Sequence, residues 1–199
     1  CIINKYKPLN ISIMRRLTTL LATVLMTVMT MSFTSCTEDP YIADSLAGTW
    51  RGNMYISTSY GGYTYDASYS ELYFDTDPYS FSSGVGYWVD HYASGAPYEY
   101  VANHITWTVR NSVIYIHLVE ENYDIAIGDY YLDDGYFAGT IYDGNNRIRF
   151  GLIHTSSPNW GSYQYGYYDY GYAKQNTGFT RSGAESVKGE KPVRIFRNN

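Results

Sequence analysis

Cysteine is almost absent from this chain of 199 residues, which has two, Cys1 and Cys36. Cys1 lies upstream of Met14, the residue at which we expect translation to begin, so residues 1–13 are interpreted as an untranslated upstream extension. Cys36 is then the one cysteine of the expressed chain. This scarcity excludes a disulfide framework, a cysteine-ligated zinc site and a cysteine nucleophile.

The apolar run near the start of the chain is too short to cross a bilayer as a permanent helix. Residues 17–33 make a run of 17 residues, whereas a spanning helix needs about 20. Two arginines precede the run, and Phe33-Thr34-Ser35-Cys36 follows it with small residues beside the cysteine. This order predicts a lipoprotein signal peptide over residues 14–35. We expect cleavage before Cys36 and lipid on its thiol, which would tether the protein to a membrane.

Basic residues are scarce in most of the remaining chain. Residues 36–173 hold 4 Lys and Arg against 17 Asp and Glu, a net charge of −13, whereas residues 174–199 hold 6 against 2. So acidic a body argues against nucleic acid as a partner. Residues 36–45 are interpreted as an acidic tether, and Glu38 and Asp39 resemble an export signal. We therefore expect an outer-membrane lipoprotein at the cell surface, with a periplasm-facing position as the alternative.

No part of the mature chain has a long apolar period of 3.6 residues, so little in it favours helices. Tyrosine is abundant instead, with 25 residues beside 7 Phe, 4 Trp and 18 Gly. Aromatic residues favour strands and glycine favours turns and bulges. Eight strand-like runs separated by turn residues predict an all-β, antiparallel up-and-down meander: residues 49–57, 69–75, 84–92, 104–110, 113–120, 123–132, 136–143 and 146–155.

Short turns predict the pairing of these strands. A turn at Asn111-Ser112 places three apolar pairs on one face: Val109 with Ile114, Trp107 with Ile116, and Ile105 with Leu118. Turns at Asp134-Gly135 and Gly144-Asn145 pair Leu132 with Phe137, Ile141 with Ile148, and Phe137 with Leu152. Ile125 and Ile127 are out of phase with Tyr130 and Leu132, which predicts a bulge near Gly128-Asp129. A long sheet with one apolar face must curl over or close on itself to bury that face.

The first strand carries a resemblance to a known family. Gly48-Thr49-Trp50 matches the Gly-x-Trp that opens the first strand of lipocalins, and Trp107–Asn111, Tyr131–Asp134 and Phe137–Gly139 are similar to small lipocalin-like lipoproteins of gut anaerobes. The resemblance covers most of residues 46–155. It implies an eight-stranded barrel in which Gly48 and Trp50 belong to the motif that closes one end. A second lipocalin signature is not found, so a closed and a half-open barrel both remain possible.

The resemblance and the strand pattern set the domain limits. We assign residues 46–180 to a lipocalin-like β-domain and residues 181–199 to a basic, flexible tail. As an alternative for part of that tail, Pro192–Phe196 could form an edge strand.

Aromatic residues are the candidate ligand-binding residues. Tyr and Trp rings carry a polar group and stack well on flat faces such as those of sugars and peptides. The candidates are Tyr60, Tyr63, Tyr65, Trp160, Tyr163, Tyr165 and Tyr167. The alternative is that these residues are paired strands whose tyrosines simply cover a sheet.

Catalysis has little support in the sequence. There is no nucleophile motif, no histidine dyad and no phosphate loop, and the Asp-rich turns lack the ligand pattern of a calcium loop. We expect no catalytic residues, no cofactor and no metal. Five carboxylates are nevertheless available to a glycosidase: Glu71, Asp90, Glu99, Glu120 and Glu121.

The sequence predicts non-catalytic binding of a glycan or a small apolar ligand. The alternative is an accessory subunit that binds another envelope protein, and a glycoside-acting enzyme comes third.

Overall fold

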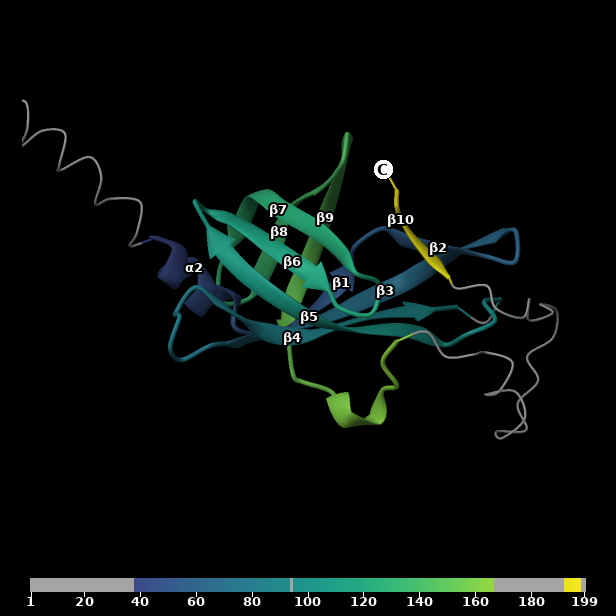
Figure 1. The fold of residues 1–199 in the computed structure, drawn as a ribbon, viewed down its shortest axis with the longest axis horizontal. Helices are drawn as coiled ribbons and strands as arrows, with labels where there is room; N and C mark the ends of the chain where they lie inside the picture. Colours follow the sequence, from purple (N-terminus) through teal and green to yellow (C-terminus); the bar gives the residue numbers. More distant parts are fainter. Residues whose placement is uncertain (1–37, 94, 167–191, 198–199) are drawn as a thin grey trace, which may run out of the picture. The chain divides into compact units, whose positions relative to one another are not determined.

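The computed structural model describes residues 38–93, 95–166 and 192–197. Within these residues the protein is all-β, with one α-helix and one short 3-10 helix (Figure 1). The elements are α2 (Glu38–Leu46), β1 (Gly48–Asn53), β2 (Ile56–Tyr60), β3 (Tyr63–Thr76), β4 (Ser83–Tyr92), β5 (Tyr100–Arg110), β6 (Val113–Leu118), β7 (Tyr123–Leu132), β8 (Tyr136–Asp143), β9 (Asn146–Thr155), η1 (Trp160–Ser162) and β10 (Val193–Phe196). The signal peptide over 14–35, Cys36, Tyr167 and residues 181–191 lie outside the described residues.

Eight of the strands form a closed antiparallel barrel. They follow the order β1-β9-β8-β7-β6-β5-β4-β3, and β3 pairs back onto β1 from Gly48↔Phe74 to Gly52↔Ser70. Of the closed and half-open alternatives, the structure has the closed one. β3 is longer than the barrel needs, and its first residues pair with β2, which in turn pairs with β10. The sheet therefore extends past the barrel on one side.

The predicted hairpin registers are confirmed. β5 and β6 pair Val109 with Ile114, Trp107 with Ile116 and Ile105 with Leu118, around Asn111 and Ser112 at positive φ. β8 and β9 pair Ile141 with Ile148 and Phe137 with Leu152. The predicted bulge is also present, because the register of β7 on β8 shifts between Gly128 and Tyr131, with Asp129 at a φ of 47°. Two-residue turns and one apolar face were sufficient to define these pairs.

The first predicted strand, over residues 49–57, is two strands in the structure. Tyr55 has a φ of 53°, which breaks the extended chain between β1 and β2. The side chain of Asn53 stabilises this break, since its Oδ1 accepts a hydrogen bond from the Tyr55 backbone N–H at 2.7 Å. The chain then turns away from the barrel wall and enters the β2–β3 extension.

The expected tether over residues 36–45 is wrong for its described part, because residues 38–46 form helix α2. Ala43 and Leu46 are fully buried, and the Leu46 carbonyl accepts a hydrogen bond from Trp50 Nε1 at 2.7 Å. The Asp39 carboxylate accepts hydrogen bonds from the backbone N–H groups of Asn111 and Ser112 at 3.0 and 2.9 Å. The helix thus covers the end of the barrel that holds the β5–β6 turn. We call this the helix end.

Among the described residues, no helix is long and apolar enough to cross a membrane.

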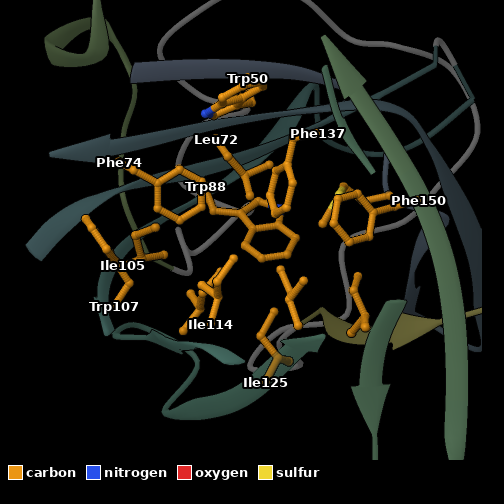
Figure 2. Packing of buried hydrophobic residues seen from close by; sticks show 14 of the residues in the cluster. Trp50, Leu72, Phe74, Trp88, Ile105, Trp107, Ile114, Ile125, Phe137 and Phe150 are labelled. Atoms are coloured by element: carbon orange, nitrogen blue, oxygen red, sulfur yellow. The ribbon is translucent and has the colours of Figure 1, made fainter. Parts of the chain in front are cut away.

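An apolar core fills the barrel interior. Trp50, Trp88, Phe74 and Phe137 are among its largest fully buried side chains, and every strand of the barrel contributes to it. Figure 2 shows these rings and the surrounding isoleucines pointing toward one another from the barrel walls. Each buried Leu, Ile or Phe contributes about 1.5–3 kcal/mol, so this core is the main source of stability.

The domain limit at residue 180 and the flexible tail are wrong for residues 192–197. Val193–Phe196 form β10, which pairs antiparallel with β2 from Val193↔Ser59 to Phe196↔Ile56. The edge-strand alternative is the one that the structure has. Pro192 and Phe196 are buried, and Phe196 joins the main core. We call this end of the barrel, which also holds the β6–β7 turn, the β10 end.

Candidate functional site: an aromatic outer face

The outer surface of β3, β4 and β5 carries two cross-strand rows of rings. Successive strand residues point to opposite faces, so outward residues that are paired in register stand side by side. One row is Tyr73, Tyr87 and His104, and the other is Tyr69, His91 and Tyr100. In the first row the Tyr73 and Tyr87 rings stack at 6.0 Å between centroids, and in the second the Tyr69 and His91 rings stack at 4.4 Å. We call these rows together the outer aromatic face.

The segment that follows β9 brings three predicted candidates onto this face. The Trp160 ring stacks on Tyr87 at 5.3 Å and on Tyr73 at 5.8 Å between centroids. Tyr165 lies 4.1 Å from the His104 ring, and Tyr163 meets Tyr100 edge-on at 5.1 Å. Residues far apart in the sequence therefore meet here. Trp160, Tyr163 and Tyr165 are each half-buried, so they cover part of the face and also extend it toward solvent.

A buried carboxylate anchors the same segment. Glu71, only 7 % exposed, lies at 3.0 Å from His91 Nε2 and accepts a hydrogen bond from the Tyr163 hydroxyl at 3.1 Å. Burial, reinforced by the Glu71 charge, raises the pKa of Tyr163 above its ordinary value, so this hydroxyl stays a hydrogen-bond donor. A backbone bond from Gly166 N–H to the Ala102 carbonyl holds the far end of the segment.

A shallow depression of about 150 Å³ lies beside these rings. Its lining combines three rings with two polar groups and two exposed valines: Tyr73, Tyr87, His104, Asp75, Thr106, Val85 and Val119, together with Gly86 and Ile105. Pockets for drug-sized ligands are about 300–1,000 Å³, so this one suits a single small unit of a larger ligand. Ring faces beside a carboxylate and a hydroxyl can bind a ligand that has both a flat apolar side and hydroxyl groups.

The other predicted aromatic candidates belong to a different cluster. Tyr60, Tyr63 and Tyr65 lie in the β2–β3 hairpin, which turns at Gly61 and Gly62 with φ of 59° and 76°. Tyr60 is buried with Tyr92 and Tyr98, and Tyr65 packs against the same cluster. Tyr63 is 68 % exposed, and Tyr167 lies outside the described residues.

The Gly-x-Trp motif lies at the helix end. Trp50 is fully buried beneath α2 and meets the Phe137 ring edge-on at 5.7 Å. Gly48 has a φ of 118°, a conformation that favours glycine, and a Cβ there would stand 2.6 Å from His154 Nε2 and displace that side chain.

Sequence reasoning missed a buried ionic site at the β10 end. The Arg194 side chain, 3 % exposed, forms ion pairs with Asp90 Oδ2 and, at 2.8 Å, with Glu121 Oε1. Burial alone would raise the pKa of Glu121, but the Arg194 guanidinium brings it below its ordinary value. The pKa of Arg194 is in turn held well above its ordinary value by the two carboxylates, against the effect of burial. Only the charge contrast between the acidic body and the basic last residues could have indicated such a pair.

The carboxylates available to a glycosidase are held by other partners. Asp90 and Glu121 share one guanidinium, Glu71 is bonded to His91 and Tyr163, and Glu120 pairs with His104. Glu99 is exposed. Among the residues with described positions, no group of three His, Cys, Asp or Glu could hold a metal ion.

Comparisons with protein-family models, with curated protein sequences and with solved structures found no match.

Proposed function

We propose that this protein is a lipid-anchored, lipocalin-like protein of the outer membrane that binds a carbohydrate without catalysis. The Cys36 lipobox supports the anchor, and Gly48-Thr49-Trp50 on the first strand of an eight-stranded barrel supports the lipocalin-like kinship. The acidic residues after Cys36 favour display at the cell surface.

The single observation that carries the proposal is the depression in the outer aromatic face. Tyr73, Tyr87 and His104 line it with the parts of their rings that Trp160 and Tyr165 leave uncovered, and Asp75 and Thr106 stand beside them. A pyranose ring has an apolar face of C–H groups and a rim of hydroxyls, so it can stack on an aromatic ring while donating hydrogen bonds to a carboxylate. The protein's surplus of acidic groups favours neutral or cationic sugars over acidic ones.

The packed interior favours a carbohydrate over an apolar ligand. A small lipophile of the lipocalin type would need space inside the barrel, where Trp50, Trp88, Phe137 and their neighbours form one buried cluster. Opening that space would separate side chains that stabilise the fold, at about 1.5–3 kcal/mol for each one exposed.

A substitution that fills the depression tests the proposal. Val119 is 45 % exposed and lines the depression, so Val119→Trp should block it without disturbing the core. The matched control is Ile153→Trp on β9, where the side chain is 59 % exposed and does not line the depression. Thermal unfolding would be measured against panels of host and plant glycans and of lipophiles. A ligand at about 100 times its Kd adds about 2.7 kcal/mol.

A glycan should stabilise the unsubstituted protein and the Ile153→Trp control but not Val119→Trp. Stabilisation by a lipophile alone, or equal glycan binding by both variants, would contradict the proposed site. A panel without any hit would favour the accessory-subunit alternative.

The anchor is tested separately in the chain that begins at Met14. Cys36→Ser should abolish incorporation of labelled fatty acid and leave the protein unprocessed or soluble, compared with the unsubstituted chain. Fatty-acid labelling that survives Cys36→Ser would disprove the anchor and leave the carbohydrate site untouched.

A further inference from the structure

The strand at the β10 end is an addition to a barrel that is already closed. Pairing of β1 with β3 completes the eight-stranded ring, and β10 pairs with β2 outside that ring. Four residue pairs, from Val193↔Ser59 to Phe196↔Ile56, hold β10 on the edge of β2. Removing β10 would leave the barrel ring intact and would expose that edge.

Beneath this edge lies a polar cradle formed by Ser70, Asp90, Asn103 and Glu121, which we call the acid cradle. Ser70 Oγ and Trp88 Nε1 donate hydrogen bonds to Asp90 Oδ1 at 2.6 and 2.9 Å, and Asn103 Nδ2 donates to Glu121 Oε1 at 2.8 Å. Asp90 is fully buried and Asn103 is 1 % exposed. Groups of the barrel other than Arg194 thus orient both carboxylates.

The acid cradle matches the shape of a guanidinium group. Arg194 donates from Nε to Glu121 Oε2 at 3.0 Å, from Nη2 to Glu121 Oε1 at 2.8 Å, and from Nη1 to Asp90 Oδ2. Its guanidinium also lies 5.3 Å above the Trp88 ring. A forked, planar cation can make these contacts at once, whereas a lysine ammonium cannot. The Asn103 Oδ1 atom is buried without a hydrogen-bond partner among the described residues, so the cradle can accept one more donor.

We infer that the β2 edge and the acid cradle form a binding site for an arginine-bearing extended segment, and that residues 192–197 of a second copy of this chain can occupy it. Two copies would then exchange their C-terminal strands. The inference does not depend on the carbohydrate site. The exchanged state keeps every contact of β10, since the acceptor site and the inserted segment are the same in both states.

Chain length and charge support a second copy as the occupant. Residues 167–191 separate Gly166 from Pro192, and a chain of 25 residues can span at most about 90 Å, enough to reach a neighbouring molecule. The acceptor body carries −13 over residues 36–173 and the inserted region +4 over residues 174–199, so copies attract each other through these parts. Residues 192–197 of the same chain compete with those of a second copy for the site, and because they are tethered to it their effective concentration is about millimolar. Exchange between copies should therefore increase as the protein concentration approaches that range.

A mixed disulfide tests the exchange in residues 38–199, which contain every described helix and strand and no cysteine. One copy carries Ser59→Cys and the other Val193→Cys, two positions that face each other across β2 and β10. Neither copy can form an intramolecular disulfide. The two are unfolded together, refolded at increasing concentration, oxidised and weighed by mass spectrometry. A chain with both substitutions shows whether this pair can form a disulfide within one molecule.

Exchange predicts a mixed disulfide between the two copies whose yield rises with concentration. A peptide of residues 190–199 added during refolding should lower that yield at least tenfold, and the same peptide with Arg194→Ala should not. The out-of-register pair Ser59→Cys and Ile195→Cys should give little product. Absence of the mixed disulfide while the double-cysteine chain oxidises internally would overturn the inference. So would a yield that the two peptides lower equally, because the acid cradle would then have no part in binding.

Discussion

The two ends of this barrel are closed by opposite kinds of chemistry. At the helix end, α2 covers Trp50 with Ala43 and Leu46, and a buried hydrogen bond joins Trp50 Nε1 to the Leu46 carbonyl. At the β10 end, a buried arginine meets two buried carboxylates. A substitution in the apolar helix α2 removes only the packing of the substituted side chain. A buried ionic closure behaves differently, because removal of one partner leaves the others charged and desolvated.

The largest effect should come from Arg194→Met, which keeps the length of the side chain and removes its charge. Asp90 and Glu121 would remain buried without their cation, and breaking a buried pair in this way costs about 3–5 kcal/mol. Urea unfolding followed by tryptophan fluorescence would measure it. Arg197→Met is the matched control, because the Arg197 pair with Asp66 is exposed and should be worth about 0.2–1 kcal/mol at most. Equal losses from the two variants would show that burial of the Arg194 pair has no energetic consequence.

A slightly smaller loss is expected at the helix end. Leu46→Ala removes a fully buried side chain from the core and leaves a cavity beside Trp50, at a cost of about 2–5 kcal/mol. Asp44→Ala in the same helix is the control, since Asp44 is exposed. Unfolding in urea should show the loss with an unchanged denaturant dependence. If Leu46→Ala cost as little as its control, α2 would not be part of the core.

The smallest effect is a difference in pH dependence. The folded-state pKa of Glu121 lies below its ordinary value of 4.5, so its contribution to stability is present above that value and is lost as pH falls through the folded pKa. In Arg194→Met, burial without the cation should raise the pKa of Glu121, and the sign reverses: this group then favours folding as pH falls.

The measurement is the free energy of unfolding between about pH 6 and pH 2, with Arg197→Met as a reference that should keep the slope of the unsubstituted protein. Parallel curves for Arg194→Met and the unsubstituted protein would mean that Arg194 does not control the ionisation of Glu121.

Local patterns made most of the barrel predictable. The β5–β6 hairpin needs only the Asn111-Ser112 turn and three apolar pairs, and a one-residue slip would place all of them in water. The start of β3 was harder to predict. Its first residues, from Tyr63, alternate tyrosine with Thr, Asp and Ser, so neither face is distinctly apolar, and the strand was expected to begin at Tyr69. Helix α2 has nine residues with Pro40 in its first turn, and only two are buried, which gives little periodic signal.

The sites were less predictable than the fold, for a different reason. Trp160, Tyr163 and Tyr165 could be selected as aromatic residues, but their partners Tyr73, Tyr87 and His104 come from three other strands. Arg194 was harder still, since it meets Asp90 across 104 residues and Glu121 across 73. No spacing rule connects such residues, because the closed ring of strands creates their proximity.

The order of these charges along the chain has a consequence for biosynthesis. Asp90 and Glu121 are made well before Arg194, so during synthesis every strand of the barrel ring exists before the cation of these two acids does. A chain cut short before residue 194 would carry every strand of the barrel ring but lack the cation of Asp90 and Glu121, so it should be less stable than the full chain and more open to proteolysis. The chain should therefore reach its full stability only after Arg194 has been made.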